Sequence, residues 1–234
     1  MPEEQKNLPR EWNGQTMTYL EYKKAIEFGK EEYDRIAAYA REIGIEWTAS
    51  VWDIDSLDFI AQYPKIPFIK VPSACITDMA LLRAIKDRGL LAIISTGMST
   101  GEMIDRAIDA LGDSFGGILH CNSTYPSSES ELDLRVIDTY ARKFKYDDMT
   151  IAVGYSSHDT SNLPCLLAVA LGAWVIERHV TLDKNLPGTD QKASATMEEL
   201  RELCQDISRV QQMLGHSYPT FYQSEQIIAK KLRR

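Results

Sequence analysis

The run Glu177-Arg178-His179 places a carboxylate and an imidazole two positions apart. It ends a stretch of β-forming residues, and side chains at positions i and i+2 of a strand point to the same side. A carboxylate beside an imidazole suits metal binding or proton transfer. The same spacing also fits a Glu–His pair that only caps a strand, so both interpretations stay open.

A second histidine follows an earlier β-rich run, in Gly154-Tyr155-Ser156-Ser157-His158. If the two runs form neighbouring strands, His158 and His179 can meet across adjacent loops. Two imidazoles with oxygen ligands suit a divalent transition metal such as Mn2+, Co2+ or Zn2+. A histidine in a solvent-exposed loop would produce the same pattern, and this alternative stays open.

Groups that could bind an anion follow three other β-rich runs. Lys70 lies in Phe68–Ser73, and a lysine in a buried strand is costly unless an anion pairs with it. It can hold a phosphate, form a Schiff base or reach out to solvent. The run Ser95–Thr100 joins a strand to a helix, where hydroxyls and free backbone N–H groups suit a phosphate or carboxylate or simply cap the helix. The run His120–Pro126 is similar.

Short β-rich runs alternate with helical patterns along most of the chain, which indicates βαβ units and a parallel sheet. Polar residues follow many of these runs, and the chain has no GxGxxG or P-loop motif. A (β/α)8 barrel gathers its functional groups at the carboxyl ends of its strands, so it is favoured over an open doubly wound sheet. Six runs are fewer than the eight of a complete barrel, so we expect an incomplete α/β barrel of TIM type. The runs are Ile45–Val51, Phe68–Val71, Leu91–Ser95, Ile118–Cys121, Ile151–Tyr155 and Trp174–His179.

Three segments follow from these patterns. Residues 1–29 are polar and irregular and are predicted to form a loop, residues 30–217 a partial barrel domain, and residues 218–234 the start of a linker. Helix starts are predicted at Asp78, at Ser99 with Glu102 as a capping box, and at Thr196 with Glu199 as another.

The composition excludes several classes of protein. The 234 residues carry a formal net charge of -8, and an acidic surface disfavours nucleic acid as a partner. The four cysteines form no CxxC pair, which disfavours zinc ribbons and fits reduced thiols in the cytosol. No signal peptide is present, and the longest apolar stretch, residues 163–176, is shorter than the ~20 residues of a membrane span. We therefore expect a soluble cytoplasmic protein without a membrane partner.

Taken together, five motifs are far more specific than any of their parts. The match extends from about Thr18 to Arg234, and it closely resembles the N-acetylneuraminate (sialic acid) synthase family, including relatives that make other nonulosonic acids. In order, the motifs are PFIKVPS, ISTGMST, LHCNSTYP, VGYSSHDT and AVALGAWVIERHVTLDKNLPGTDQKAS.

The resemblance implies a (β/α)8 barrel followed by a small antifreeze-like domain. It implies condensation of phosphoenolpyruvate with an N-acetylated amino sugar such as N-acetylmannosamine, with a divalent metal: Mn2+ is expected, with Mg2+ and Co2+ as alternatives. It makes His158 and His179 the metal ligands and Glu177 the acid/base group. The implied substrate contacts are Ser50, Lys70, Ser73, Ser95, Ser123, Tyr125, Ser156 and, on the sugar side, Asp190.

The chain also departs from the family's pattern. Ser157 replaces an acidic residue often found before the metal histidine, and Ser50 stands where threonine is frequent. The family's first two strands and its antifreeze-like domain are expected to be missing, and the full-length family is expected to form homodimers. An open barrel exposes two sheet edges, so we expect low stability or dependence on a partner, with weak or no activity alone.

Two other functions remain open at this stage. One is a lysine Schiff-base aldolase that uses Lys70. The other is a non-catalytic subunit of the same fold that binds a ligand or pairs with an active partner.

Overall fold

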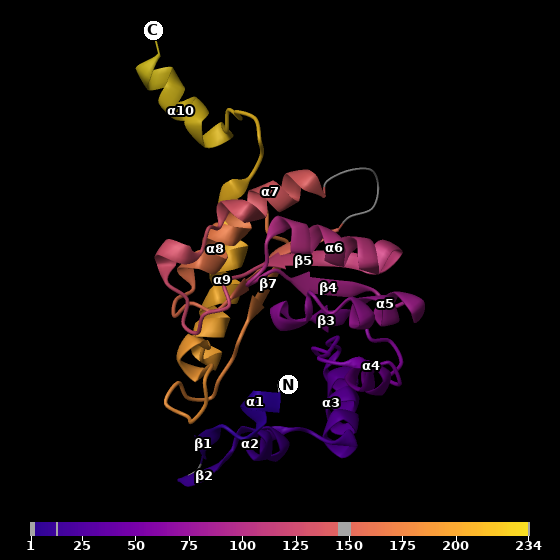
Figure 1. Ribbon diagram of the computed structural model, residues 1–234. Helices are drawn as coiled ribbons and strands as arrows, with labels where there is room; N and C mark the ends of the chain where they lie inside the picture. Colours follow the sequence, from indigo (N-terminus) through magenta and orange to yellow (C-terminus); the bar gives the residue numbers. More distant parts are fainter. Residues whose placement is uncertain (1–2, 13, 145–150, 234) are drawn as a thin grey trace.

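The computed structural model describes residues 3–12, 14–144 and 151–233 of the chain. Its centre is a curled sheet of five parallel strands in the order β3-β4-β5-β6-β7 (Figure 1). Neighbours in the sheet are also consecutive in sequence, with a helix in each connection. A doubly wound sheet reverses its strand order at one point, so this order supports the barrel type in incomplete form. The strands are Ile69–Val71 (β3), Ala92–Ser95 (β4), Phe115–His120 (β5), Ala152–Ser157 (β6) and Val175–Arg178 (β7).

The first of the six predicted strands is reduced to a single bridge. Within Ile45–Val51, Ser50 forms an isolated parallel bridge with Lys70. The Val51 N–H donates to the Lys70 carbonyl oxygen at 3.1 Å. The segment therefore lies beside β3, where a further strand would lie. The pairing covers one residue and forms no strand, so the prediction of six βα units is not confirmed: within the described residues this sheet has five strands.

Helices cover the outer side of the sheet and form the core with it (Figure 1). The strands send alternate residues outward, among them Val71, Ile94 and Val153, which are buried in this core. Each such burial stabilises the fold by about 1.5–3 kcal/mol. The other residues of each strand point to the inner side. The main covering helices are α5 (Met79–Asp87), α6 (Gly101–Leu111), α7 (Arg135–Lys143), α8 (Leu163–Ala170) and α9 (Met197–Leu214).

The starts of these helices follow the sequence in two of three cases. Asp78 caps α5, and Thr196 forms a capping box with Glu199 at the start of α9, as predicted. In α6, however, Thr100 is the capping residue, and the Ser99 hydroxyl donates to a carbonyl of its own loop. Adjacent hydroxyl residues compete for one cap, and the sequence does not say which will win.

The N-terminal segment that was predicted to be a loop contains regular structure. A two-stranded antiparallel hairpin turns at Gly14, which has a left-handed φ of 73°. Thr18 and Glu21 form a capping box that starts the next helix. The elements are α1 (Glu3–Lys6), β1 (Pro9–Trp12), β2 (Gln15–Thr18) and α2 (Tyr19–Ile26).

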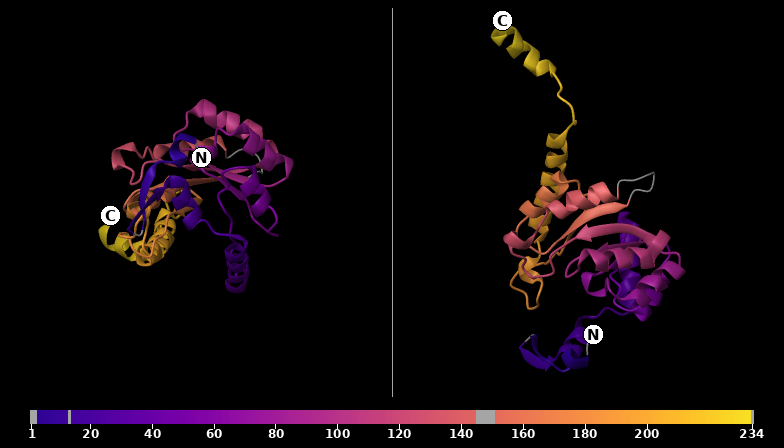
Figure 2. Two further views of the ribbon diagram at one scale, coloured as in Figure 1. Left: turned by 60° about the horizontal axis from the view of Figure 1, so that its bottom comes forward. Right: turned by 45° about the horizontal axis from the view of Figure 1, so that its top comes forward.

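The two ends of the chain lie apart from the sheet. The hairpin and α2 lie on one side of it, and α10 (Gln223–Leu232), in the segment predicted to be a linker, projects from the opposite side (Figures 1 and 2). The remaining elements are α3 (Lys30–Ile43), α4 (Ile54–Ile60) and the short 3-10 turns Ser73–Cys75, Gly112–Ser114, Glu129–Glu131 and Gln191–Ala193.

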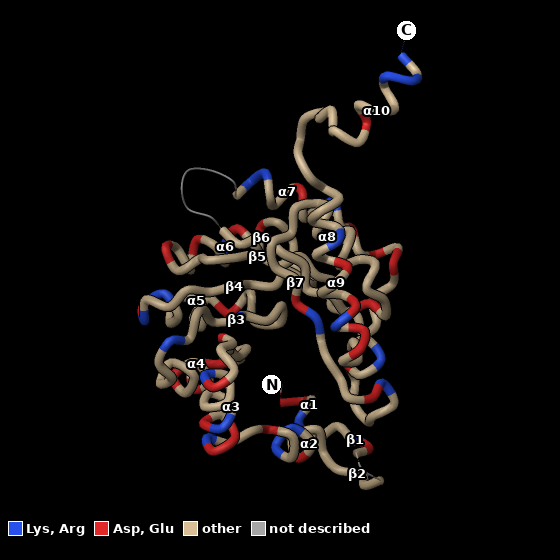
Figure 3. The backbone as a smooth tube through the Cα atoms, turned by 180° about the vertical axis from the view of Figure 1, so that it is seen from behind, with Lys and Arg blue, Asp and Glu red and all other residues tan. Residues whose placement is uncertain are grey.

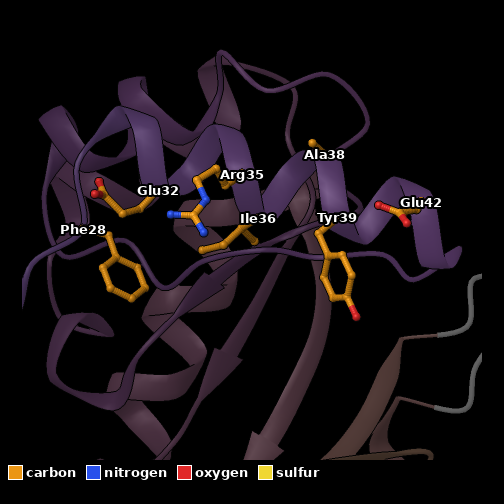
Figure 4. Close-up of a pocket in the computed structure, with 7 residues that line it drawn as sticks. All are labelled: Phe28, Glu32, Arg35, Ile36, Ala38, Tyr39 and Glu42. Carbon is orange, nitrogen blue, oxygen red and sulfur yellow. The ribbon is translucent and has the colours of Figure 1, made fainter.

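A hollow of about 650 Å³ lies on the outer side of α3 (Figure 4). None of its lining residues follows a strand of the sheet, so it is separate from the strand ends where the chemistry is expected. The lining residues are Phe28, Glu32, Arg35, Ile36, Ala38, Tyr39 and Glu42.

Charged residues lie mainly on the helices and loops, while the strands carry few (Figure 3). Glu177 and Arg178, at the end of β7, are exceptions. Among the helices in the described ranges, none combines the length and apolarity that crossing a membrane requires.

Candidate active site

Four polar side chains from four strands form a hydrogen-bonded row on the inner side of the sheet. Lys70 Nζ donates to Ser95 Oγ at 2.7 Å and lies 3.4 Å from Glu177 Oε2. Ser156 Oγ donates to Glu177 Oε1 at 2.7 Å. The register of β6 and β7 places Ser156 directly beside Glu177. We call Lys70, Ser95, Ser156 and Glu177 the inner row.

The inner row is buried at one end and open at the other. The Lys70 side chain is 8% exposed, whereas the Glu177 side chain is 35% exposed. A buried ammonium is costly unless negative groups compensate it, and Glu177 provides one. Lysine has three N–H donors, so Lys70 retains the capacity to bind an oxygen of a ligand. The open end lies at Glu177, where a ligand can approach.

A cradle of small polar groups lies next to the inner row. The Gly97 N–H donates to Ser73 Oγ at 3.0 Å, and Ser73 Oγ lies 3.1 Å from Cys121 Sγ. A Cβ atom on Gly97 would lie 2.1 Å from Ser123 Oγ and 2.9 Å from Ser73 Oγ. The hydroxyls therefore converge over bare backbone. Such a surface suits the oxygens of a phosphate or carboxylate. We call Ser73, Gly97, Cys121 and Ser123 the hydroxyl cradle.

Two histidines and a tyrosine meet beyond the end of β7 that carries Glu177. The ring centroids of His158 and His179 are 5.2 Å apart, and the Tyr125 ring lies 4.1 Å from that of His158. His158 Nδ1 lies 2.6 Å from the Asn122 carbonyl oxygen. Because a carbonyl only accepts, Nδ1 carries the proton, and Nε2 accepts from the Tyr125 hydroxyl at 3.0 Å. We call His158 and His179 the histidine pair, and Tyr125 packs against it.

The protonation states follow from burial. Burial lowers the pKa of His158, and the nearby His179 lowers it further. Burial also raises the pKa of Tyr125 to about 12, with a further contribution from the charge of Asp190. His158 is therefore a neutral imidazole, which is the form that binds a metal, and Tyr125 keeps its proton. Asp190 Oδ2 lies 3.6 Å from His179 Nδ1.

The donors around His158 fit a metal ion with few protein ligands. The Nε2 lone pair of His158 accepts from the Tyr125 hydroxyl and is the atom of this ring that could bind a metal ion. Within residues 3–12, 14–144 and 151–233, no three His, Cys, Asp or Glu side chains gather around one point. His158 and His179 are the two imidazoles here that could bind a metal ion.

The structure brings together ten of the eleven residues singled out in the sequence. Ser50 differs: it lies beside Lys70 through the backbone bridge, and its side chain is exposed. The inner row contains Lys70, Ser95, Ser156 and Glu177, the hydroxyl cradle contains Ser73 and Ser123, and the group around the histidines contains Tyr125, His158, His179 and Asp190.

Other residues matter here that the sequence did not single out as site residues. Gly97 and Cys121 complete the cradle, and Asn122 fixes the His158 ring through its carbonyl. A glycine between hydroxyl residues after a strand was the available signal for Gly97. His120, by contrast, turns away from the site and bonds to the Leu132 carbonyl through Nε2.

Comparison with known proteins shows the family. The NeuB family model matches residues 2–218. The N-acetylneuraminate-9-phosphate synthase of Mus musculus is 37% identical over 201 residues, which cover 85% of this chain and 54% of that protein. The N,N'-diacetyllegionaminic acid synthase of Legionella pneumophila is 35% identical over 208 residues, covering 86% and 57% of the two chains.

A solved structure agrees with these sequences. The N-acetylneuraminic acid (sialic acid) synthetase of Leptospira borgpetersenii serovar Hardjo-bovis superposes with a TM-score of 0.79 at 32% identity. The superposition covers 90% of this chain and 74% of that one. The chain therefore belongs to the NeuB family, as its motifs predicted. It spans a little over half the length of the two curated relatives named above.

Proposed function

We propose that this chain forms the substrate site of a nonulosonic acid synthase, which condenses phosphoenolpyruvate with an N-acetylated amino sugar and releases phosphate. The relatives, synthases of sialic and legionaminic acids, support this class of product. The observation that carries the proposal is the inner row, which joins a buried lysine to a carboxylate between an anion cradle and a histidine pair.

Phosphoenolpyruvate would bind at the lysine end of the row. Its phosphate and carboxylate oxygens match Lys70, Ser95 and the hydroxyls of the cradle, including Ser73 and Ser123. Fixed donors neutralise a highly charged anion that would otherwise repel an incoming nucleophile. Lys70 is already engaged as an ammonium by Ser95 and Glu177, which favours an anion-binding role over a Schiff base.

Glu177 would act as the acid/base group. In the proposed reaction, water adds to C2 of the enolpyruvate, C3 attacks the aldehyde carbon of the open-chain sugar, and phosphate leaves by cleavage of its C–O bond. The Glu177 carboxylate is oriented by Ser156 and Lys70 and is open to solvent on one side. It can therefore take a proton from the attacking water.

The histidine pair would hold the metal. Bound Mn2+, the expected ion, would polarise the sugar aldehyde oxygen as a Lewis acid. His158 offers a neutral ring whose orientation is fixed by Asn122, and His179 lies beside it. Asp190, next to His179 and 44% exposed at its side chain, would accept a hydrogen bond from a hydroxyl group of the sugar.

The first experiment separates substrate binding from turnover. Phosphoenolpyruvate binding is measured by calorimetry for the wild-type chain, for Lys70→Ala and for Lys143→Ala, which alters an exposed lysine paired with Asp105. We expect Lys70→Ala to lose at least about tenfold in affinity, and Lys143→Ala to match the wild type. A folded wild-type chain that binds no phosphoenolpyruvate would contradict the proposal.

Turnover is then followed as phosphate release from phosphoenolpyruvate with N-acetylmannosamine and Mn2+, with and without EDTA. Sugar-dependent release that EDTA and His179→Ala both abolish supports the synthase. Binding without release favours the non-catalytic subunit. Borohydride trapping of substrate on Lys70 would favour the aldolase.

A further inference from the structure

A buried ion pair lies on the outer side of β6 and β7, behind the candidate site. The side chains of Arg178 and Asp159 are each 3% exposed, with Nη1 and Oδ1 3.6 Å apart. Asp159 Oδ2 accepts from Ser157 Oγ at 2.7 Å and from the Tyr155 hydroxyl at 3.1 Å. Tyr155 itself is 1% exposed. This cluster of Tyr155, Ser157, Asp159 and Arg178 takes no part in the proposed reaction.

In the sequence, three residues of this cluster are direct neighbours of His158 or His179. Arg178 lies between Glu177 and His179, while Ser157 and Asp159 flank His158. Arg178 Nη1 donates to Ser157 Oγ and, at 2.7 Å, to the Asp159 carbonyl oxygen. One guanidinium thus ties the residues on both sides of His158 to the residue before His179.

A buried ion pair is costly, so its presence here indicates a role beyond filling space. A buried guanidinium without a counter-ion is strongly destabilising, and an apolar cluster of similar volume is often as stable as a buried ion pair. Arg178 Nε is buried and finds no hydrogen-bond partner within the described residues. Apolar side chains of similar volume could fill the same space. What the ion pair adds is a fixed path for the loop that carries His158.

We propose that Arg178 is a positioning residue, which holds the Ser157–Asp159 loop on β7 and thereby sets the separation of the His158 and His179 rings. Asp159 is the counter-ion that allows the guanidinium to be buried. Ser157, which stands where the family often has an acidic residue, donates instead to Asp159. The link to metal binding rests on the proposed function, in which the two histidines hold the metal.

The test uses the full chain and three variants. Arg178→Lys keeps the charge but loses the planar fork that reaches two acceptors. Arg178→Met combined with Asp159→Leu removes both charges and leaves neither unpaired. Arg142→Lys is the matched control, because Arg142 pairs with Asp138 on the surface, and its side chain is 79% exposed.

Two readouts separate positioning from simple stability. Mn2+ affinity is measured from the spin-resonance signal of the free ion, and thermal unfolding is recorded in EDTA. We expect Arg178→Lys and the double variant to remain folded yet bind Mn2+ about tenfold more weakly, since residues that orient metal ligands typically contribute 10–100-fold. Arg142→Lys should bind as the wild type does. Wild-type affinity in both folded variants would overturn the proposal.

A third readout, by NMR, reports on the His158 ring itself and does not depend on a metal. The His158 Nδ1–H that donates to Asn122 should give an imidazole proton signal in NMR spectra, which we expect to shift or vanish in Arg178→Lys and to persist in Arg142→Lys. If the wild type binds no Mn2+, the metal assignment of the proposed function fails, and this signal still decides the role of Arg178. An unchanged signal in Arg178→Lys would overturn that role.

Discussion

Each side of the β6–β7 pair carries a hydrogen bond from a serine to a carboxylate, but the two bonds serve different purposes. On the inner side, Ser156 donates to Glu177 at 2.7 Å. On the outer side, Ser157 donates to Asp159 at the same distance, beside Arg178. Strand alternation sends consecutive residues to opposite sides, so two serine–carboxylate pairs arise from neighbouring positions.

The carboxylates on the two sides differ in how many of their hydrogen-bond acceptor positions are occupied. Asp159 has donors at both oxygens, including the Ser161 N–H at 3.2 Å and Arg178, and is 3% exposed at its side chain. Glu177 is 35% exposed at its side chain and keeps free acceptor capacity. A saturated, closed carboxylate fixes structure, whereas an unsaturated, open one can exchange protons with a ligand.

The largest expected effect falls on the inner side. Glu177→Gln removes the acid/base group but keeps its shape, so the rate of phosphate release should fall by about 10²–10⁴-fold. The free energy of unfolding should also fall, since Lys70 loses its negative partner, but less than when a fully buried pair is broken, because water reaches Glu177 and Lys70 keeps its bond to Ser95. Steady-state kinetics and denaturant unfolding measure the two quantities, with the exposed Glu198→Gln as control. A variant with near wild-type turnover would show that Glu177 is not the acid/base group.

The matched change on the outer side should act on stability. Asp159→Asn keeps the shape of the side chain but leaves the buried Arg178 without a counter-ion. Loss of one partner from a buried pair costs about 3–5 kcal/mol, which for a chain of this size lowers Tm by about 10 °C. Thermal unfolding checks this. If Asp159→Asn and Glu177→Gln destabilise equally, the contrast between the two sides does not hold.

Sequence reasoning could predict the inner side because its signals are local. Polar residues that follow apolar runs mark the carboxyl ends of strands, and a parallel sheet brings those ends together. Lys70, Ser95, Glu177 and His179 were all found in this way. The parallel sheet also followed from the alternation of β-rich and helical runs, and the polar residues at the strand ends favoured the barrel type over a doubly wound sheet.

The outer side could not be predicted in the same way. Arg178 was noted only as the residue between Glu177 and His179. Nothing in the sequence says that its side chain is buried on the outer side of the sheet, under the helices, and not exposed to solvent. Its partnership with Asp159 depends on the register of β6 and β7. The N-terminal hairpin was missed for a related reason, since its strands are exposed and lack apolar alternation.

The inner side should also be limited by space. Ala at position 97 would place its Cβ 2.1 Å from Ser123 Oγ and 2.8 Å from Cys121 Sγ, which forces the hydroxyl cradle apart. Displacement of binding groups by about 1 Å can cost 10²-fold, so Gly97→Ala should weaken phosphoenolpyruvate binding by about that factor. Gly101→Ala is the control, because nothing lies within 4 Å of its Cβ. Calorimetry that finds equal affinities would exclude the cradle from the anion site.

The smallest effect tests whether the outer cluster works as a network. Tyr155→Phe deletes a hydroxyl that donates to the Asp159 carboxylate at 3.1 Å, and bonds to charged groups contribute about 1.5 kcal/mol or more. Tyr140→Phe is the matched control, since its hydroxyl reaches only the neutral Thr96 hydroxyl at 3.4 Å, and should cost about 0.5 kcal/mol.

Both tyrosine variants keep their rings, so the difference between them reports the acceptor rather than the packing. In an Asp159→Asn background the cost of Tyr155→Phe should shrink toward that of Tyr140→Phe, because the charge that strengthens the bond is gone. Denaturant unfolding of the four single and double variants measures this coupling. Strict additivity would mean that Tyr155 supports the core independently of Asp159, and that the ion pair with Arg178 alone distinguishes the outer side from the inner one.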